Sequence, residues 1–86
     1  MKVIKVFVSP TCGPCQLFKP QLRQAALDLG IDYQEYDVTT DDGINLAKQY
    51  NIQSSGQAIY FEDDIEKVRW TTPCPAAKIK SDIESC

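Results

Sequence analysis

The stretch VIKVFVSPTCGPCQLFKP, residues 3–20, runs from a strand pattern through a close cysteine pair into a helical pattern. Its first six residues are mostly β-branched and apolar, which predicts a strand buried on both faces. Apolar residues at three- and four-residue spacing, Leu17 among them, then predict a helix over residues 13–29. The sequence therefore places Cys12 and Cys15 where a buried strand passes into a helix.

The rest of the chain alternates between strand and helix patterns. Further strands are predicted at residues 31–38, 57–61 and 65–70, and further helices at residues 44–50 and 75–85. The first two strands need a right-handed parallel crossover, whereas the last two form an antiparallel hairpin. We therefore expect a single α/β domain over residues 1–86, with the order β-α-β-α-β-β-α and a central mixed four-stranded sheet flanked by three helices.

Composition and charge argue against several functional classes. The chain has 86 residues, a net charge of −3 and no cluster of Lys or Arg, which disfavours a nucleic-acid-binding surface. No apolar stretch approaches the roughly 20 residues that a membrane-spanning helix needs, and the N-terminal apolar run predicts a strand rather than a signal peptide. We expect a monomeric cytoplasmic protein that binds neither nucleic acid nor a membrane, in a compartment where thiols are mostly reduced.

The cysteine pair has the spacing and position of a redox dithiol. Cys12 lies at the start of the predicted helix, where exposed N–H groups lower the thiol pKa, so it is the expected nucleophile. Cys15 lies about one turn further in and is the expected resolving thiol. The chain has no histidine, and Cys74 and Cys86 stand at opposite ends of one predicted helix, roughly 18 Å apart. These thiols cannot surround one metal ion in a monomer, so no metal site is expected.

The motif and its surroundings resemble thioredoxin. CGPCQLFKP, residues 12–20, closely matches the active-site helix of that family, including Pro20. LAKQYNI, residues 46–52, resembles the segment before the third core strand of the family. The resemblance covers nearly the whole chain and implies a thioredoxin-like fold, and the short length makes the chain similar to minimal, glutaredoxin-sized members.

The activity that the resemblance implies is reduction of protein disulfides by dithiol exchange. Cys12 and Cys15 would react, Gly13 and Pro14 complete the motif, and no cofactor is needed beyond the redox-active pair. The implied partners are disulfide-bearing proteins and an electron donor of the thioredoxin reductase type. Glutathione is less expected, because glutaredoxins hold it with a Thr-Val-Pro segment that this chain lacks.

One departure from the resembled family lies in the loop before the third strand. Alignment puts Gly56 where the family has a cis-proline opposite the cysteine pair. Ser55, Gly56 and Gln57 therefore form the expected substrate-binding loop. A non-proline cis bond costs about 2.5–4 kcal/mol, so we expect a trans peptide at Gly56.

A second departure lies in the first strand. The family carries a buried acidic residue six positions before the first cysteine, where this chain has Val6. In the family, that acid helps to take the proton from the resolving thiol. Proton transfer from Cys15 would then use water or another group, such as Glu35 or Asp37.

Other roles stay open at this point. The chain could instead bind a metal or an iron–sulfur cluster through Cys12 of two chains, act as a glutathione-linked glutaredoxin-like enzyme, or bind a partner peptide without catalysis. Cys74, between two prolines at the expected N-cap of the last helix, is a possible third redox thiol or an incidental cysteine. Trp70 packs in the core or faces a substrate, and Cys86 is a candidate for oxidation to a dimer.

Overall fold

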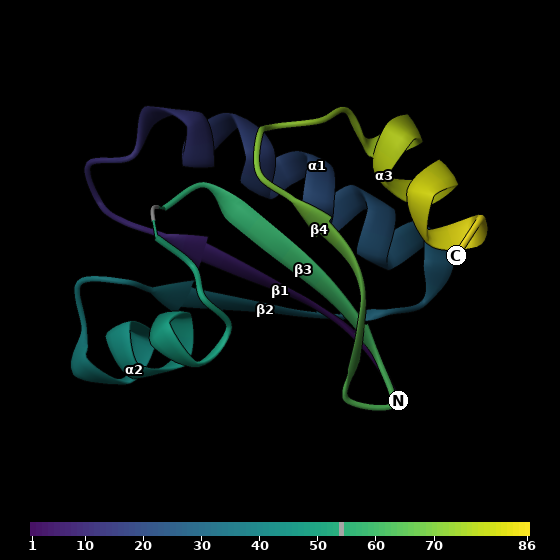
Figure 1. The fold of residues 1–86 in the computed structure, drawn as a ribbon. Helices are drawn as coiled ribbons and strands as arrows, with labels where there is room; N and C mark the ends of the chain where they lie inside the picture. The colour runs from purple at the N-terminus through teal and green to yellow at the C-terminus, as the bar shows by residue number, and fades with distance from the viewer. Residues whose placement is uncertain (54) are drawn as a thin grey trace.

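The computed structural model describes residues 1–53 and 55–86 (Figure 1). Within them, strands and helices follow one another in the predicted order, β-α-β-α-β-β-α. The elements are β1 (Lys2–Val8), α1 (Gly13–Leu29), β2 (Asp32–Asp37), α2 (Asp41–Gln49), β3 (Gln57–Glu62), β4 (Ile65–Trp70) and α3 (Ala76–Glu84). In this part of the chain they form three helices and one mixed four-stranded sheet, which confirms the predicted fold class.

The sheet has the strand order β2-β1-β3-β4. β1 is parallel to β2 and antiparallel to β3, with Phe7 opposite Gln57. β4 is antiparallel to β3, with Trp70 opposite Ala58. Because of these directions, β1, β2 and β4 finish and β3 begins at the same end of the sheet. The cysteine pair follows β1 there, and we call this end the Cys12 end.

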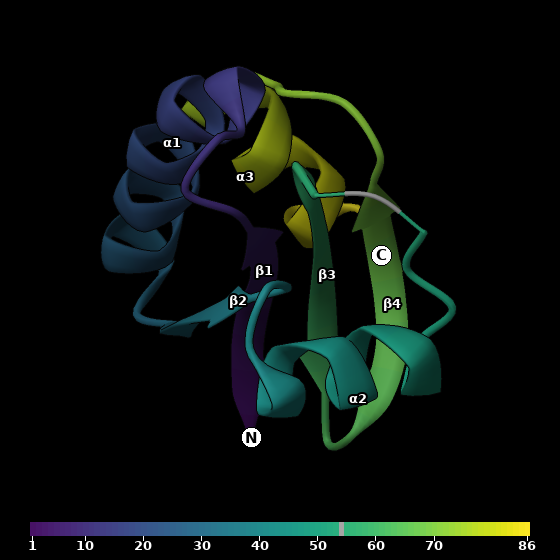
Figure 2. The ribbon, with the colours of Figure 1, turned by 90° about the vertical axis from the view of Figure 1, so that its left-hand side faces the viewer.

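Alternation along β1 builds two cores on opposite faces of the sheet. Ile4 and Val6 pack with side chains of α1 and α3, whereas Val3 and Phe7 pack with residues of α2. Figure 2 shows the resulting layers, with α1 and α3 over one face of the sheet and α2 over the other. All four side chains are buried, as the predicted two-sided burial of this strand requires.

α2 begins at Asp41 rather than at the predicted residue 44. Thr40 caps the helix, because its hydroxyl accepts a hydrogen bond from the Gly43 N–H at 3.1 Å. Gly43 also lies directly against the end of β2, where an added Cβ would stand 1.7 Å from the Asp37 carbonyl oxygen. Since only a residue without a side chain fits there, this close approach helps to fix where α2 begins.

α3 begins one residue later than predicted. Pro75 occupies the N-cap position that the sequence predicts for Cys74, and Ala76 is the first helical residue. The Ala76 N–H donates a hydrogen bond to Gln21 Oε1 at 2.8 Å. A side chain of α1 therefore serves as the cap of α3 and joins the two helices.

Gly43→Ala is expected to destabilise the fold, because a methyl group cannot fit beside the Asp37 carbonyl group. Overpacking of this kind costs about 1–3 kcal/mol, so the midpoint of urea unfolding, followed by Trp70 fluorescence, should fall. Gly13→Ala is the matched control, since an added Cβ there meets nothing within 4 Å. Equal midpoints for the two variants would contradict the close contact between α2 and β2.

Candidate active site

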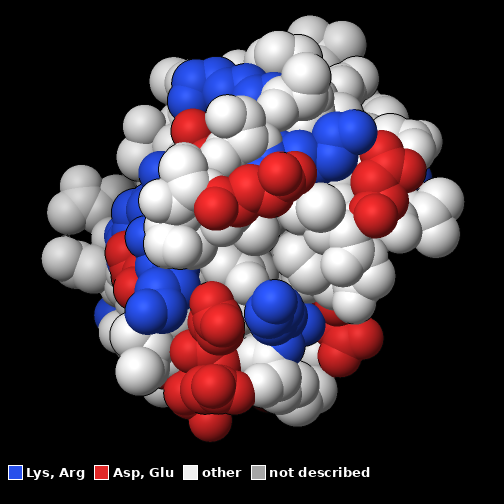
Figure 3. All heavy atoms as spheres, turned by 90° about the vertical axis from the view of Figure 1, so that its right-hand side faces the viewer, with Lys and Arg blue, Asp and Glu red and all other residues white. Residues whose placement is uncertain are grey.

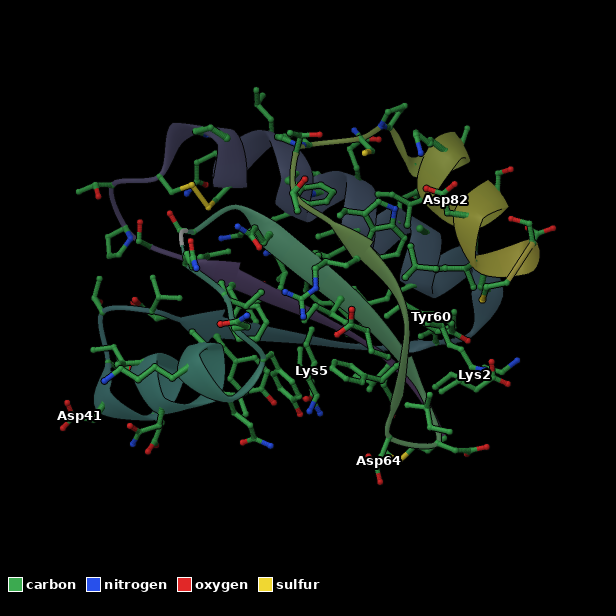
Figure 4. All side chains as sticks on the ribbon, in the orientation of Figure 1. Lys2, Lys5, Asp41, Tyr60, Asp64 and Asp82 are labelled. Atoms are coloured by element: carbon green, nitrogen blue, oxygen red, sulfur yellow. A yellow bond between two sulfur atoms is a disulfide. The ribbon has the colours of Figure 1, made fainter. Side chains whose placement is uncertain are left out.

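The cysteine pair lies at the junction of β1 and α1 (Figure 4). A disulfide joins Cys12 and Cys15, whose Cα atoms are 5.3 Å apart. Cys12 has extended backbone angles and is the N-cap of α1, and Gly13 and Pro14 begin the helix. The Cys15 N–H donates a hydrogen bond to Cys12 Sγ at 3.1 Å, so this sulfur takes the place of an N-capping oxygen.

The two cysteines differ in exposure. Cys15 is completely buried, whereas Cys12 is partly exposed. Val6 of β1 is also completely buried in the core that α1 covers. A molecule outside the protein can therefore reach Cys12 but not Cys15. The helix N-terminus also places partial positive charge beside Cys12, which stabilises a thiolate there.

Gly56 lies directly across from the disulfide. A Cβ added to Gly56 would be 3.7 Å from Cys12 Sγ and 3.9 Å from Cys15 Sγ. The Gly56 N–H donates a hydrogen bond to the Phe7 carbonyl oxygen at 2.8 Å, which ties this segment to the end of β1. Its φ of +87° favours glycine, and no peptide bond between described residues is cis, in agreement with the trans bond expected at Gly56. Because Gly56 has no side chain, its backbone lies beside the two sulfur atoms with no Cβ between them.

The neighbours of Gly56 in the expected substrate-binding loop also lie at the Cys12 end. The Ser9 hydroxyl donates a hydrogen bond to the Ser55 hydroxyl at 3.4 Å, across the space between β1 and the loop. Gln57 is the first residue of β3 and lies opposite Phe7 on β1. The structure therefore brings all three loop residues to one end of the sheet, with Gly56 against the sulfur atoms.

The two carboxylates considered for proton transfer have other partners. Glu35 on β2 accepts a hydrogen bond from Arg23 at 2.9 Å and forms an ion pair with Lys19 at 3.3 Å. Partial burial raises the pKa of Glu35, but the bonds from Arg23 and Lys19 outweigh it and hold the pKa below its usual value. Hydrogen bonds from the Thr39 hydroxyl and N–H lower the pKa of Asp37. Both groups are therefore ionised at neutral pH and already hydrogen-bonded.

Cys74 is half-buried and carries a free thiol. Its Sγ donates a hydrogen bond to the Thr72 carbonyl oxygen at 3.3 Å. It lines a shallow groove, which we call the Leu17 groove and whose other lining residues are Leu17, Gln21, Pro73 and Pro75. Cys86, the second free thiol among the described residues, is exposed. The structure therefore places Cys74 in a surface groove and gives it no sulfur partner among these residues.

Leu17 is exposed, although its place in the apolar pattern predicts burial. It belongs to the apolar set that predicts α1, yet its side chain is 71% exposed. It follows Pro14 by three residues and Gly13 by four, so helical geometry puts all three on one face of α1. This spacing was the signal in the sequence that could have predicted an exposed Leu17 on the same helix face as Gly13 and Pro14.

Trp70 belongs to the core. It is buried, and its Nε1–H donates a hydrogen bond to Asp82 Oδ2 on α3 at 2.9 Å. The core interpretation of this residue is therefore correct, because a buried ring with a satisfied N–H leaves little surface for a substrate.

The described residues provide neither a metal site nor a membrane span. In residues 1–53 and 55–86, no group of three or more His, Cys, Asp or Glu side chains is placed to hold a metal ion. Within the same ranges, no helix is long and apolar enough to cross a membrane.

Comparison with known protein sequences finds thioredoxins among the relatives of this chain. The family model described as Thioredoxin matches residues 1–85. The thioredoxin of Mycoplasma genitalium is 38% identical over 77 residues, which cover 90% of this chain and 74% of that protein. Thioredoxin M4, chloroplastic, of Arabidopsis thaliana is 30% identical over 82 residues, which cover 95% of this chain and 42% of that protein.

Comparison with solved structures supports the fold. Thioredoxin 1 from Thermosipho africanus has a TM-score of 0.84 at 19% identity, over 96% of this chain and 91% of that one. The N21Q mutant thioredoxin from Halobacterium salinarum has a TM-score of 0.85 at 25% identity, over 98% of this chain and 73% of that one. The match to these structures extends over nearly the whole chain. In contrast, the chain spans less than half the length of thioredoxin M4 of Arabidopsis thaliana.

Gly56→Ala is expected to slow the reduction of the disulfide by dithiothreitol severalfold, because the new methyl group contacts both sulfur atoms. The positive φ of Gly56 should also cost about 1–2 kcal/mol of folding free energy. Gly30→Ala is the matched control: its φ is +66°, but an added Cβ there meets nothing within 4 Å.

Thiol alkylation followed by mass spectrometry measures the rate of reduction. Both variants should lose stability, and only Gly56→Ala should also react more slowly. If the two variants are reduced at the same rate, Gly56 does not control access to the disulfide.

Proposed function

The chain belongs to the thioredoxin family and is a thiol–disulfide oxidoreductase of the protein-disulfide reductase type, and we propose that Cys12 is its nucleophile and Cys15 its resolving thiol. The family, fold and activity predicted from the sequence are thereby confirmed. The observation that best supports the two roles is the unequal exposure of a disulfide at a helix N-terminus. Cys12 is partly exposed and Cys15 is fully buried.

In the first step, the Cys12 thiolate attacks one sulfur of a substrate disulfide. The substrate S–S bond breaks, a bond forms between Cys12 and the substrate, and the released sulfur leaves as a thiolate that takes up a proton. The Cys15 N–H, 3.1 Å from Cys12 Sγ in the disulfide form, stabilises negative charge on this sulfur before the attack. Only Cys12 is accessible, so the mixed disulfide forms on this residue.

In the second step, Cys15 loses its proton and attacks Cys12 Sγ. The bond between Cys12 and the substrate breaks, the second substrate thiol leaves, and the Cys12–Cys15 disulfide forms. The substrate gains two electrons and the protein loses two. Val6 supplies no carboxylate, and the side chains of Glu35 and Asp37 are hydrogen-bonded to other residues. We therefore infer that water or the departing substrate thiolate accepts the Cys15 proton.

The family implies disulfide-bearing protein substrates and reductase partners in general. We propose more narrowly that the electron donor is of the thioredoxin reductase type, and that a single domain of residues 1–86 acts as a cytoplasmic monomer without a cofactor. Glutathione is the weaker candidate, because Ser55, Gly56 and Gln57 supply no cation to hold its carboxylates. The family assignment does not favour the glutaredoxin-like, metal-binding or iron–sulfur alternatives.

Single cysteine variants test the two roles. Cys15→Ser is expected to form a stable mixed disulfide with a disulfide-bearing protein such as insulin, because no thiol remains to release it. Cys12→Ser should form no adduct and lose turnover, since the buried Cys15 cannot reach a substrate. Cys86→Ser is the control that should retain turnover, because Cys86 is exposed and lies outside the site.

The measurements are intact-mass spectrometry for the adduct and insulin reduction in the presence of dithiothreitol for turnover. An adduct that forms on Cys12→Ser but not on Cys15→Ser would reverse the assigned roles.

A further inference from the structure

We propose that Lys19 is a positioning residue for the second step of the reaction, because its ammonium group stabilises the negative charge that forms on Cys15 Sγ. The inference rests on the proposed function, since it concerns the step in which Cys15 releases the substrate from Cys12. It deepens that function by naming the group that makes a buried thiol reactive. Lys19 keeps its own proton and takes no part in the exchange of sulfur–sulfur bonds.

Cys15 needs such a group because its side chain is completely buried. Burial disfavours the charged form of a thiol, and the attack on a disulfide requires the thiolate. Val6 on β1, in the core that α1 covers, has no polar atom in its side chain. Among the described residues, no buried side chain is an Asp, Glu, Lys or Arg. A charge that stabilises the thiolate must therefore come from the border of the core.

Lys19 stands one helical turn after Cys15 on α1. Residues four apart lie on the same face of a helix, with Cβ atoms about 5–6 Å apart. Side chains of a helix also tilt toward its N-terminus, which directs the Lys19 side chain back toward the turn that contains Cys15. The sequence has no charged residue between Lys5 and Lys19. Lys19 is therefore the nearest charged residue to Cys15 along α1.

The ammonium group of Lys19 is held beside the core rather than in solvent. The Lys19 side chain is 20% exposed, and its Nζ lies 3.3 Å from Glu35 Oε1 on β2. Glu35 lies opposite Val6 in the register of the two parallel strands. Its bond to a residue of α1 puts the Glu35 side chain on the face of the sheet that α1 covers. The ion pair therefore lies at the border of the core into which Cys15 is packed.

The ion pair leaves positive charge near Cys15, because Lys19 does not have Glu35 to itself. The Arg23 guanidinium donates a hydrogen bond to Glu35 Oε2 at 2.9 Å. The bonds from both cations hold the pKa of Glu35 below its usual value, so this carboxylate stays ionised. Two cations thus share one anion, and the three groups together are positive. Arg23 lies one turn further from Cys15, so Lys19 is the cation nearer to the thiol.

The strands under α1 offer no other cation. The β1 and β3 residues in this core are apolar except Tyr60, which stays neutral because burial raises its pKa. Burial also raises the pKa of Tyr33 on β2 and keeps it neutral. Asp37 at the end of β2 is ionised and hydrogen-bonded by Thr39, and its negative charge would disfavour a thiolate. Among these strand residues, the titratable groups are therefore neutral or of the wrong sign.

α3, the helix that packs against α1, does not supply the charge either. Lys80 pairs with Asp28 at 2.9 Å, in the last turn of α1 and far from the cysteines, and Lys78 pairs with Asp82 at 2.8 Å. Cys74, just before α3, carries an uncharged thiol hydrogen-bonded to the backbone. Figure 3 shows charged side chains of both signs crowded on the end of the molecule opposite the disulfide. Exposed charges further away than ~10 Å are largely screened at moderate ionic strength.

Lys19 acts on the charged state that precedes the bond exchange. The Cys15 thiol gives its proton to water or to the departing substrate thiolate, and the electron pair stays on Cys15 Sγ. This thiolate attacks Cys12 Sγ, the bond between Cys12 and the substrate breaks, and the substrate sulfur leaves with the electron pair of that bond. A nearby cation favours the thiolate and so increases the fraction of Cys15 that can attack.

Three variants of α1 test the proposal. Lys19→Met removes the charge and keeps an unbranched side chain, whereas Lys19→Arg keeps the charge. Arg23→Met is the matched control, because it removes the other cation bound to Glu35, one turn further from Cys15. All proteins carry serine at positions 74 and 86, so that the motif cysteines are the thiols that react.

The assay follows the two steps separately. Reduced protein is mixed with excess dithiodipyridine, an uncharged disulfide, in a stopped-flow spectrophotometer. Attack by Cys12 releases one coloured thiopyridone, and attack of Cys15 on Cys12 releases a second. The rate of the first release depends on the reagent concentration and that of the second does not, so the second measures the reaction of Cys15. Its dependence on pH reports the pKa of Cys15, which the Cβ chemical shift of Cys15 checks in reduced protein.

Lys19→Met is expected to raise the midpoint of the pH profile for the second release by about one pH unit, because the cation is lost. About tenfold less thiolate, which is about threefold more nucleophilic at the higher pKa, slows the second release about threefold near neutral pH. Lys19→Arg should stay within about twofold of wild type, and Arg23→Met should shift the midpoint by less than about a third of a unit, because the attraction falls with distance. The first release should change less than about twofold in every variant, because the exposed Cys12 is stabilised by the helix N-terminus.

The outcomes separate this inference from the proposed function. If wild-type protein releases no thiopyridone, or only the first, the proposed function fails. If it releases both but Lys19→Met keeps the wild-type midpoint, only the role of Lys19 is overturned, even if the second release is slower. Equal shifts for Lys19→Met and Arg23→Met would also overturn it, because they would trace the effect to the partners of Glu35 and not to the cation beside Cys15.

Discussion

The pairing of β1 on both of its edges is the constraint on which the rest of the structure depends. β1 is hydrogen-bonded to β2 on one side and to β3 on the other, so it has no free edge. Its side chains alternate between the core under α1 and α3, with Ile4 and Val6, and the core under α2, with Val3 and Phe7. If a strand held in this way shifted by one residue, each of its side chains would move from one core to the other. The position at which it ends, just before the cysteine motif, is therefore fixed.

The reactive geometry follows from that fixed end. The chain turns directly into α1, so Cys12 becomes the N-cap and its sulfur accepts the Cys15 N–H. The last residues of the same strand hold the facing loop, through the hydrogen bond from Gly56 to the Phe7 carbonyl group. One strand thus positions both sides of the disulfide, and the sulfur atoms are placed by backbone hydrogen bonds rather than by flexible side chains.

The sequence was sufficient where the determining interactions are local. Helix N-terminal signals around Cys12 and the apolar patterns of the strands predict the order of elements, because capping and alternation act over a few residues. The close approach of Gly43 to Asp37 could not be predicted, since it depends on two elements that meet only in the folded chain. Lys5 interrupts an apolar strand, and the residues that its side chain contacts are also distant in sequence. Its Nζ lies 5.1–6.0 Å from the centres of three aromatic rings on the α2 face.

Burial of Cys15 has a consequence for the order of events in turnover. A protein that delivers electrons and a protein that receives them must both react at the single accessible sulfur, that of Cys12. They therefore exclude each other, and no ternary complex can carry electrons directly between them. The molecule works as a carrier that leaves one partner before it meets the next, with the ping-pong kinetics typical of a covalent intermediate.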